Sequence, residues 1–300
     1  MNDAISVNML SRQFGHTPAL DRVSFAVPEG SICGLLGRNG AGKTTLMSII
    51  AGQDRPTSGD VNVLGGRPFE NQEVLSKVTY IRDNQVYPDG YKLLHVLRIA
   101  PDFAENWDSE LANELVDGFR IPSKTRVKKF SRGQLSALAI VIGLASRAPL
   151  TLLDEPYLGL DGDARALFYD VLVRDYQAHP RTILMSTHLI EESESLFDRV
   201  VIVERGRIAV DSERDDARKL AFVLSGTADV VDRLAAGSQV LRTQSVGSLK
   251  SVTVAGEMNP ELINEAREAG AQASSASLQE LVSAYGRGDA DDETKKAGRK

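Results

Sequence analysis

A glycine-rich segment, GRNGAGKT at residues 37–44, constrains this chain more than any other feature. It fits the pattern GxxxxGK[ST], and it stands between an apolar run at residues 31–36 and a stretch of helical composition at residues 45–51. A strand, a tight loop and a helix in this order aim backbone N–H groups and the positive end of the helix dipole at one spot. The segment therefore predicts a site for the phosphates of a nucleotide.

Two side chains complete this phosphate site. Lys43 is expected to neutralise the β- and γ-phosphates, and the hydroxyl of Thr44 is expected to coordinate Mg²⁺. Glycine allows the backbone to approach the phosphates because it carries no Cβ atom. The residues expected around the phosphates are Gly37, Arg38, Asn39, Gly40, Ala41, Gly42, Lys43, Thr44 and Thr45.

A second motif is an apolar strand that ends in two acidic residues, PLTLLDEP at residues 149–156. Asp154, at the end of the strand, is expected to hold Mg²⁺ through water. Glu155, the next residue, is expected to polarise the attacking water as a general base. The alternative for two such carboxylates is a helix N-cap and its neighbour, and the phosphate loop favours the catalytic interpretation. The motif is typical of a Walker B element.

The order of elements predicts an α/β protein. Residues 5–27 indicate antiparallel strands at a sheet edge, and residues 106–119 and 133–148 have helical periodicity. Strand and helix patterns then alternate between residues 150 and 206, which indicates a mainly parallel sheet. Beyond residue 212, strand patterns at 221–224 and 240–255 and helical patterns at 228–236 and 260–269 predict a small α+β unit.

Composition excludes several classes of protein. The net charge of −6 gives no basic footprint, so nucleic acid is not expected as a partner. The most apolar segment, residues 135–145, is much shorter than the roughly 20 residues that a bilayer crossing needs. The N-terminus lacks the basic and apolar regions of a secretory signal, so the chain is expected in the cytoplasm. The single cysteine, Cys33, is expected to be a core residue of a strand.

The segment FSRGQ, residues 130–134, precedes an apolar helix and lies shortly before Asp154. It resembles the signature of the ATP-binding cassette (ABC) family, usually written LSGGQ. The resemblance implies that Ser131, Gly133 and Gln134, at a helix N-terminus, bind the γ-phosphate of ATP held by an opposite cassette. Phe130 and Arg132 depart from the usual residues. Arg132 could add positive charge beside the phosphate or could face solvent.

Further positions resemble motifs of the same family. Asp161, in GLD at residues 159–161, resembles the D-loop that touches the partner cassette. His188, after the strand TILMST, resembles the switch histidine that contacts the γ-phosphate and positions water. Phe14 resembles the aromatic residue that stacks on adenine, a place usually filled by Tyr. The alternative for Phe14 is an ordinary core aromatic residue of a β-strand.

The Q-loop of the family has two candidates here. When residues 80 and 81 are aligned with the usual strand end, Asp83 takes the place of the expected glutamine, and Gln85 follows two residues later. Either could bind Mg²⁺ and the catalytic water. Gln85 is favoured because its amide is both a donor and an acceptor. Residues 86–97 are then the expected contact surface for a cytoplasmic helix of a permease.

The resemblance covers about residues 4–210 and implies the following organisation. An ABC ATPase domain with a mixed sheet and an antiparallel β edge spans residues 1–212, and its helical subdomain spans about 86–148. The α+β appendage spans residues 213–285, and residues 286–300 are expected to be a disordered tail.

The implied function is that of an ATPase subunit with ATP and Mg²⁺ as cofactors. It would pair with a second cassette, identical or a paralogue, and power a separately encoded membrane permease from the inner face of the cell membrane. The stretch FAENWDSELANEL, residues 103–115, and the appendage resemble a branch that commonly acts in export. The alternatives are a soluble ABC ATPase of translation or DNA repair, and a P-loop kinase or motor.

Overall fold

The central element of the fold is a six-stranded sheet. The computed structural model describes residues 2–82 and 85–286. The strand order in the sheet is β5-β6-β7-β3-β8-β9, in which the first five strands are parallel and β9 pairs antiparallel with β8. The strands are β3 (Ile32–Leu36), β5 (Val78–Arg82), β6 (Leu150–Asp154), β7 (Thr182–Thr187), β8 (Arg199–Glu204) and β9 (Arg207–Glu213). The mainly parallel sheet predicted from the alternation, and the mixed sheet that the resemblance implies, are therefore confirmed.

A three-stranded antiparallel sheet lies against this central sheet, and its order is β2-β1-β4. Helix α1 (Lys43–Ile50) shares one apolar core with both sheets, since its residues Leu46, Met47, Ile49 and Ile50 are fully buried with residues from β1, β6 and β8. The strands of the smaller sheet are β1 (Asp3–Phe14), β2 (Thr17–Pro28) and β4 (Ser58–Val63). The hairpin predicted within residues 5–27 is β1 and β2.

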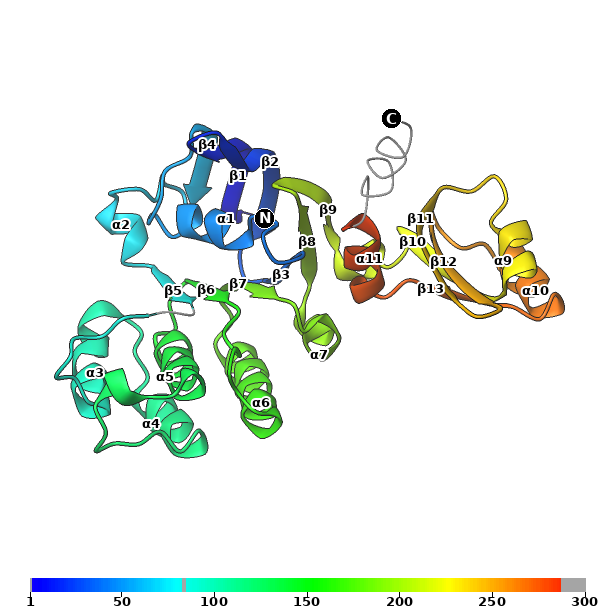
Figure 1. Cartoon of the computed structure of the whole chain (residues 1–300). Helices are drawn as coiled ribbons and strands as arrows, with labels where there is room; N and C mark the ends of the chain where they lie inside the picture. The colour runs from blue at the N-terminus through cyan, green and yellow to red at the C-terminus, as the bar shows by residue number, and fades with distance from the viewer. Residues whose placement is uncertain (1, 83–84, 287–300) are drawn as a thin grey trace.

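The helical subdomain projects from the end of the central sheet near β5 and β6 (Figure 1). Helix α5 (Arg132–Ala145) carries its apolar residues into a core with Ile81 of β5 and Leu153 of β6. The other helices of the subdomain are α3 (Leu93–Ile99), η1 (Ala100–Phe103), α4 (Ser109–Gly118) and η2 (Val127–Lys129), whereas α2 (Gln72–Leu75) precedes β5 and lies near β4 and α1. Asp108 caps α4 and Ser131 caps α5, so both helices begin where a side chain accepts a backbone N–H.

A group of four charged residues joins the helical subdomain to the rest. Arg147 follows α5 with a left-handed φ of 42°, and its guanidinium reaches Asp175 of α6 (Gly162–Ala178) at 2.8 Å and Asp108 at 2.8 Å. Arg181 pairs with Asp175 from the other side, also at 2.8 Å. Because Asp175 and Arg181 are buried, the loss of one partner would leave an uncompensated buried charge. This cost holds α4, α5 and α6 in one arrangement.

The appendage is built on a four-stranded antiparallel sheet of order β11-β12-β10-β13, covered by α9 and α10. The predicted strand pattern at residues 240–255 is a hairpin, because Gly247 turns the chain with a φ of 61°. The elements from β7 onward are α7 (Ile190–Ser193), η3 (Glu194–Leu196), α8 (Arg214–Ala217), β10 (Ala221–Thr227), α9 (Ala228–Leu234), β11 (Val240–Val246), β12 (Leu249–Ala255), α10 (Pro260–Glu268), β13 (Gln272–Ser275) and α11 (Leu278–Tyr285).

Helix α11 follows the appendage in the chain but packs on the central domain. Leu278, Leu281 and Val282 are buried in the same core as Ile190 and Phe197, whereas the appendage sheet has a core of its own. Figure 1 shows α11 between β9 and the appendage strands. The predicted tail overlaps the described residues only at Gly286, and residues 287–300 lie outside them.

Cys33 is fully buried in β3, as expected, and burial raises the pKa of its thiol. Within residues 2–82 and 85–286, we find no helix with both the length and the apolar character that a membrane crossing requires.

Candidate active site

The glycine-rich loop connects β3 to α1, as the pattern predicts. A Cβ atom on Gly37 would lie 2.2 Å from the carbonyl oxygen of Val203, and one on Gly42 would lie 2.8 Å from that of Ala19. Both glycines have positive φ angles, 145° and 112°. The loop is therefore pressed against β8 and β2 in a form that only glycine allows, and it leaves the first-turn N–H groups of α1 without intrahelical partners.

Lys43 is buried at the bottom of this loop, with 6% of its surface exposed. Its ammonium donates to the carbonyl oxygens of Gly37 at 2.7 Å and Arg38 at 3.3 Å, and it lies 3.9 Å from Oε1 of Glu155. Burial lowers the pKa of Lys43, and the carboxylates of Glu155 and Asp154 oppose that shift. A ligand with negative charge would therefore find an ammonium that is only partly compensated.

The two acidic residues of the second motif take different positions. Asp154 remains in β6, where its Oδ1 accepts a hydrogen bond of 2.5 Å from the hydroxyl of Ser186 on β7, and Tyr80 donates to its Oδ2 at 3.4 Å. Glu155 leaves the strand with a left-handed φ of 50°, and its N–H donates to the hydroxyl of Ser186 at 3.0 Å. Strained backbone of this kind is common at functional sites.

His188 follows the end of β7, and its Nδ1 atom lies 2.6 Å from Oε2 of Glu155. The structure thus brings Lys43, Glu155 and His188, which are far apart in the sequence, into contact around one carboxylate. Parallel strands explain this, because the carboxyl ends of β3, β6 and β7 meet at one edge of the sheet. Close neighbours that the sequence analysis did not single out are Ser186 and Tyr157. Polar residues at the end of an otherwise apolar strand would have signalled Ser186.

The space around the glycine-rich loop suits a nucleoside triphosphate and Mg²⁺. A cavity of about 230 Å³ is lined by Ala19, Asn39, Gly40, Gly42, Lys43, Thr44, Thr45 and Glu155. A neighbouring hollow is lined by Arg38, Asn39, Gly40, Ala41, His188, Glu204, Arg205 and Gly286. Backbone N–H groups, an ammonium and a helix N-terminus form the donor set that phosphates require. A hydroxyl and a carboxylate, from Thr44 and Asp154, form a donor set that fits Mg²⁺.

The signature segment and the D-loop touch each other within this chain. Ser131 and Gln134 form a capping box at the start of α5, with bonds of 3.2 and 3.0 Å. Gly133 packs so closely on Gly159 that a Cβ atom would lie 2.3 Å from the carbonyl oxygen of Gly159. Asp161 accepts from the N–H of Ala164 and caps α6. Arg132 is exposed. The roles of these residues toward a partner's ATP remain predictions.

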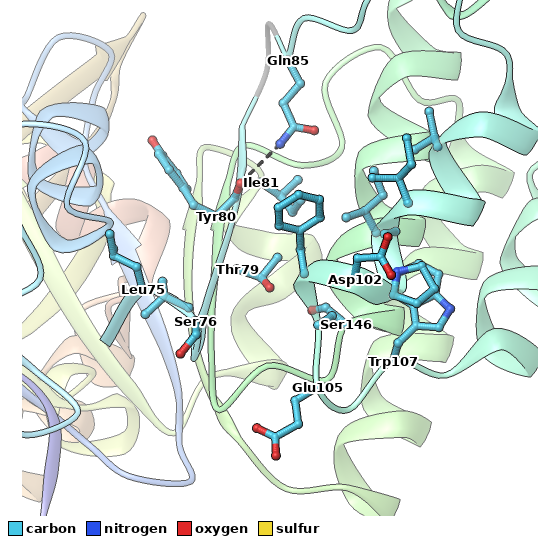
Figure 2. Close-up of a pocket in the computed structure, with 18 of the residues that line it drawn as sticks. Leu75, Ser76, Thr79, Tyr80, Ile81, Gln85, Asp102, Glu105, Trp107 and Ser146 are labelled. Atoms are coloured by element: carbon cyan, nitrogen blue, oxygen red, sulfur yellow. Dashed lines mark hydrogen bonds between the residues drawn. The ribbon is translucent and has the colours of Figure 1, made fainter. Parts of the chain in front are cut away.

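Phe14 and Gln85 complete the set of predicted residues. Phe14 is 50% exposed at the end of β1, with the guanidinium of Arg12 4.3 Å from its ring centroid, so it is not a core aromatic residue. Gln85 donates to the carbonyl oxygen of Tyr80 at 3.3 Å (Figure 2). It also accepts from the hydroxyl of Tyr87 at 3.1 Å. It has no contact with Asp154 among the interactions of the described residues. Asp83, the other Q-loop candidate, lies outside the described residues.

Together, the fold and the site define a P-loop nucleotide-binding protein with the motif order of an ATP-binding cassette. Residues 20–158 match the family described as ABC transporter. The chain is 31% identical over 229 residues to an uncharacterized ABC transporter ATP-binding protein of Methanocaldococcus jannaschii, an alignment that covers 74% of this chain and 83% of that protein.

Two further comparisons agree. The chain is 29% identical over 240 residues to the aliphatic sulfonates import ATP-binding protein SsuB 1 of Burkholderia lata, covering 79% of this chain and 73% of that protein. A solved ATP-binding subunit of an ABC transporter superposes with a TM-score of 0.64 at 28% identity, covering 72% of this chain and 92% of that one. The chain therefore belongs to the ATP-binding proteins of ABC transporters, and it is an ABC ATPase.

Proposed function

We propose that two cassettes pair around MgATP to power a separate membrane permease from the cytoplasmic face, in the direction of export. The observation that carries this proposal is the convergence of Lys43, Glu155 and His188 at the glycine-rich loop, within 3.9 Å of one carboxylate. Such a cluster supports ATP hydrolysis, and the exposed Ser131 at the start of α5 supports a phosphate contact across a pair of cassettes. The direction of export rests on the resemblance of residues 103–115 and of the appendage to the exporter branch.

The proposed division of labour follows from the contacts. Glu155 accepts the proton of the attacking water, and Lys43 balances charge on the β- and γ-phosphates. When MgATP binds, the side chain of His188 breaks its contact with Glu155. It then contacts the γ-phosphate and orients the water. Thr44 and Asp154 hold Mg²⁺, which would supply charge neutralisation at the phosphates when bound. Phe14 stacks on adenine, which its exposed ring allows.

A large cavity supports a docking site for the permease. It has a volume of about 1090 Å³ and lies beside β5 and the helical subdomain, as Figure 2 shows. Its lining is mostly apolar or aromatic and includes Leu75, Tyr87, Val96, Phe103 and Trp107. Phe103 is 78% exposed, and Gln85 lies on the wall of the same cavity. An apolar hollow of this size suits an inserted helix of another protein. Gln85 would connect that helix to the nucleotide site.

The hydrolytic part of the proposal is tested by Glu155→Gln. The variant should lose about 10²–10⁴-fold in ATP turnover, because the general base is removed, and it should bind MgATP with unchanged affinity. It should also accumulate as a dimer in MgATP when followed by size-exclusion chromatography with light scattering. Glu114→Gln, an exposed carboxylate on α4, is the matched control and should behave as wild type. Turnover near the wild-type rate in Glu155→Gln would contradict the mechanism.

The docking part is tested with a neighbouring gene product that contains several hydrophobic segments of about 20 residues. The chain should co-purify with this protein from membranes, and Phe103→Asp should abolish the association, because a carboxylate would be buried in an apolar hollow. Val246→Asp, at an exposed apolar residue of the appendage, is the matched control. Equal binding by both variants would exclude this cavity as the docking site. ATP-driven transport into inside-out vesicles would support export, and the opposite movement would contradict it.

A further inference from the structure

Tyr157 lies beneath the catalytic cluster. It follows the Walker B strand in the segment between β6 and α6, and only 2% of its surface is exposed. Its ring meets the ring of His188 edge to face, with centroids 5.5 Å apart. A fully enclosed tyrosine hydroxyl needs hydrogen-bond partners, and its partners here are the residues that carry out the proposed chemistry.

The hydrogen bonds of this hydroxyl assign its donor and acceptor roles. Its oxygen lies 2.5 Å from Oε2 of Glu155, which can only accept when ionised, so the hydroxyl donates to the carboxylate. The backbone N–H of His188 donates to the hydroxyl at 2.8 Å. Thr187 lies 2.6 Å away and must donate as well, because the tyrosine has a single proton. The hydroxyl thus donates one bond and accepts two short ones, and the N–H of Leu189 and Nδ1 of His188 make longer contacts with it, each at 3.4 Å.

These bonds form a chain that starts at the backbone. Leu189 donates its N–H to the hydroxyl oxygen of Thr187 at 2.9 Å, Thr187 donates to Tyr157, and Tyr157 donates to Glu155. Bonds in such a chain polarise and strengthen one another. Burial and the neighbouring Glu155 carboxylate raise the pKa of Tyr157, so the hydroxyl keeps its proton. The chain therefore ties one oxygen of Glu155 to the rigid end of β7.

The other two neighbours of Glu155 have a second task. Lys43 and His188 are both assigned to the phosphates of ATP. Their contacts with Glu155 are therefore replaced by contacts with the phosphates when a nucleotide binds. Tyr157 is enclosed and is not among the residues that line the two hollows at the glycine-rich loop. Its bond to Glu155 can therefore persist through the cycle. This matters because the left-handed backbone of Glu155 lies outside the strand that would otherwise orient it.

We propose that Tyr157 is a positioning residue for hydrolysis: its hydroxyl holds the carboxylate of Glu155 and the main chain of His188 in one register, so that the base faces the water when MgATP is bound. The proposal rests on Glu155 as the general base. It adds a residue that touches neither the phosphates nor the water and acts through its two neighbours.

The test is Tyr157→Phe in the full chain, which removes the hydroxyl and keeps the ring. Loss of a hydrogen bond to a charged group should lower kcat about 10- to 100-fold, while the KM for ATP and the affinity for MgATP stay unchanged. The slowed variant should also accumulate an ATP-bound dimer. Tyr176→Phe is the matched control, because the hydroxyl of Tyr176 donates to the carbonyl oxygen of Gly30, away from the site. It should retain wild-type turnover.

Two further measurements separate positioning from a general structural role. In the nucleotide-free protein, Tyr157→Phe should shift the backbone amide resonance of His188, whose N–H loses its acceptor, and Tyr176→Phe should not. In the Glu155→Gln background, Tyr157→Phe should add less than about a twofold loss of turnover, because the two residues act as a unit.

Each outcome bears on a different statement. Wild-type kcat in Tyr157→Phe, with Glu155→Gln inactive, would overturn the positioning role and leave the general base intact. A full additional loss in the double variant, or a lower melting temperature with weaker MgATP binding, would assign Tyr157 to packing and overturn the proposal. Turnover retained in Glu155→Gln would instead contradict the proposed function itself.

Discussion

At the scale of single residues, the site brings the ammonium of Lys43 and the side chain of His188 to the carboxylate of Glu155. The ammonium of Lys43 is buried and donates hydrogen bonds to two carbonyl oxygens of the loop. The carboxylate of Glu155 contacts Lys43, His188 and Tyr157. A triphosphate would replace the weak carbonyl contacts of Lys43 with charge-assisted ones. The sequence predicted Lys43, Glu155 and His188 as site residues, and their mutual contacts and the place of Tyr157 come from the structure.

Lys43→Ala tests this view of the ammonium. We expect MgATP affinity to fall about 10- to 100-fold, because the charge-assisted hydrogen bonds to the phosphates are lost. Isothermal titration calorimetry measures the effect. Lys77→Ala, at an exposed lysine paired with Glu73, is the control and should bind as wild type. Unaltered affinity of Lys43→Ala would remove the lysine from the phosphate site.

At the scale of elements, helix α5 and the segment before α6 are in direct contact. Gly133 and Gly159 are in backbone contact, and the hydroxyl of Ser136 donates to the carbonyl oxygen of Leu158 at 2.6 Å. The signature segment and the D-loop are therefore packed against each other inside one chain. The sequence indicated the signature segment and the D-loop, but it did not indicate the contact between them.

Gly133→Ala probes this contact. The new methyl group would lie 2.3 Å from a backbone oxygen, so the helix and the loop must separate. We expect a loss of about 1–3 kcal/mol of folding free energy, as for other overpacked sites, and weaker MgATP-dependent dimerisation. Chemical denaturation and light scattering measure the two effects.

Gly162→Ala is the matched control for this prediction. It lies at the start of α6, where a Cβ atom would meet nothing within 4 Å, and its backbone is helical. Alanine should therefore leave the stability unchanged or raise it slightly. Equal behaviour of the two variants would show that the contact between Gly133 and Gly159 carries no constraint.

At the scale of the whole molecule, the last described helix returns to the nucleotide site. Helix α11 buries Leu281 in the core of the central domain, and the chain then reaches Gly286, whose carbonyl oxygen accepts from the guanidinium of Arg38 at 2.8 Å. The appendage is thus tied to the central domain at both of its ends, by β9 at residue 213 and by α11. Strand β9 of the central sheet ends at Glu213 and β10 of the appendage sheet begins at Ala221, and the domain boundary predicted at residue 212 stays a prediction.

Leu281→Ala tests the shared core. Removing a fully buried leucine should cost about 2–5 kcal/mol and should lower the stability of the central domain, because the cavity lies in its core. Hydrogen exchange should show the loss of protection in α7 and β8. Leu262→Ala, at a partly buried residue that packs against the core of the appendage sheet, should lower protection in β10 and β12 only. The reverse pattern would contradict the assignment of α11 to the central core.

The sequence by itself determined the parts that depend on local chemistry. Short stretches of sequence determine the phosphate loop, the acidic strand end, the alternating strands and helices, and the helix caps. The reason is that glycine conformation, periodicity and capping act over a few residues. Lys43, Asp154 and Glu155 could be named for this reason, and His188 was named from the resemblance to the ABC family.

The tertiary structure alone decided what depends on distant residues meeting. The pairing order of β3, β6 and β7 brings Glu155, His188 and Tyr157 together, and Ser186 bonds to Asp154 only because β6 and β7 are neighbours. The return of α11 depends on which apolar surfaces find a partner. Burial and strand neighbours are set by the packing of the whole chain, and no short pattern carries that information.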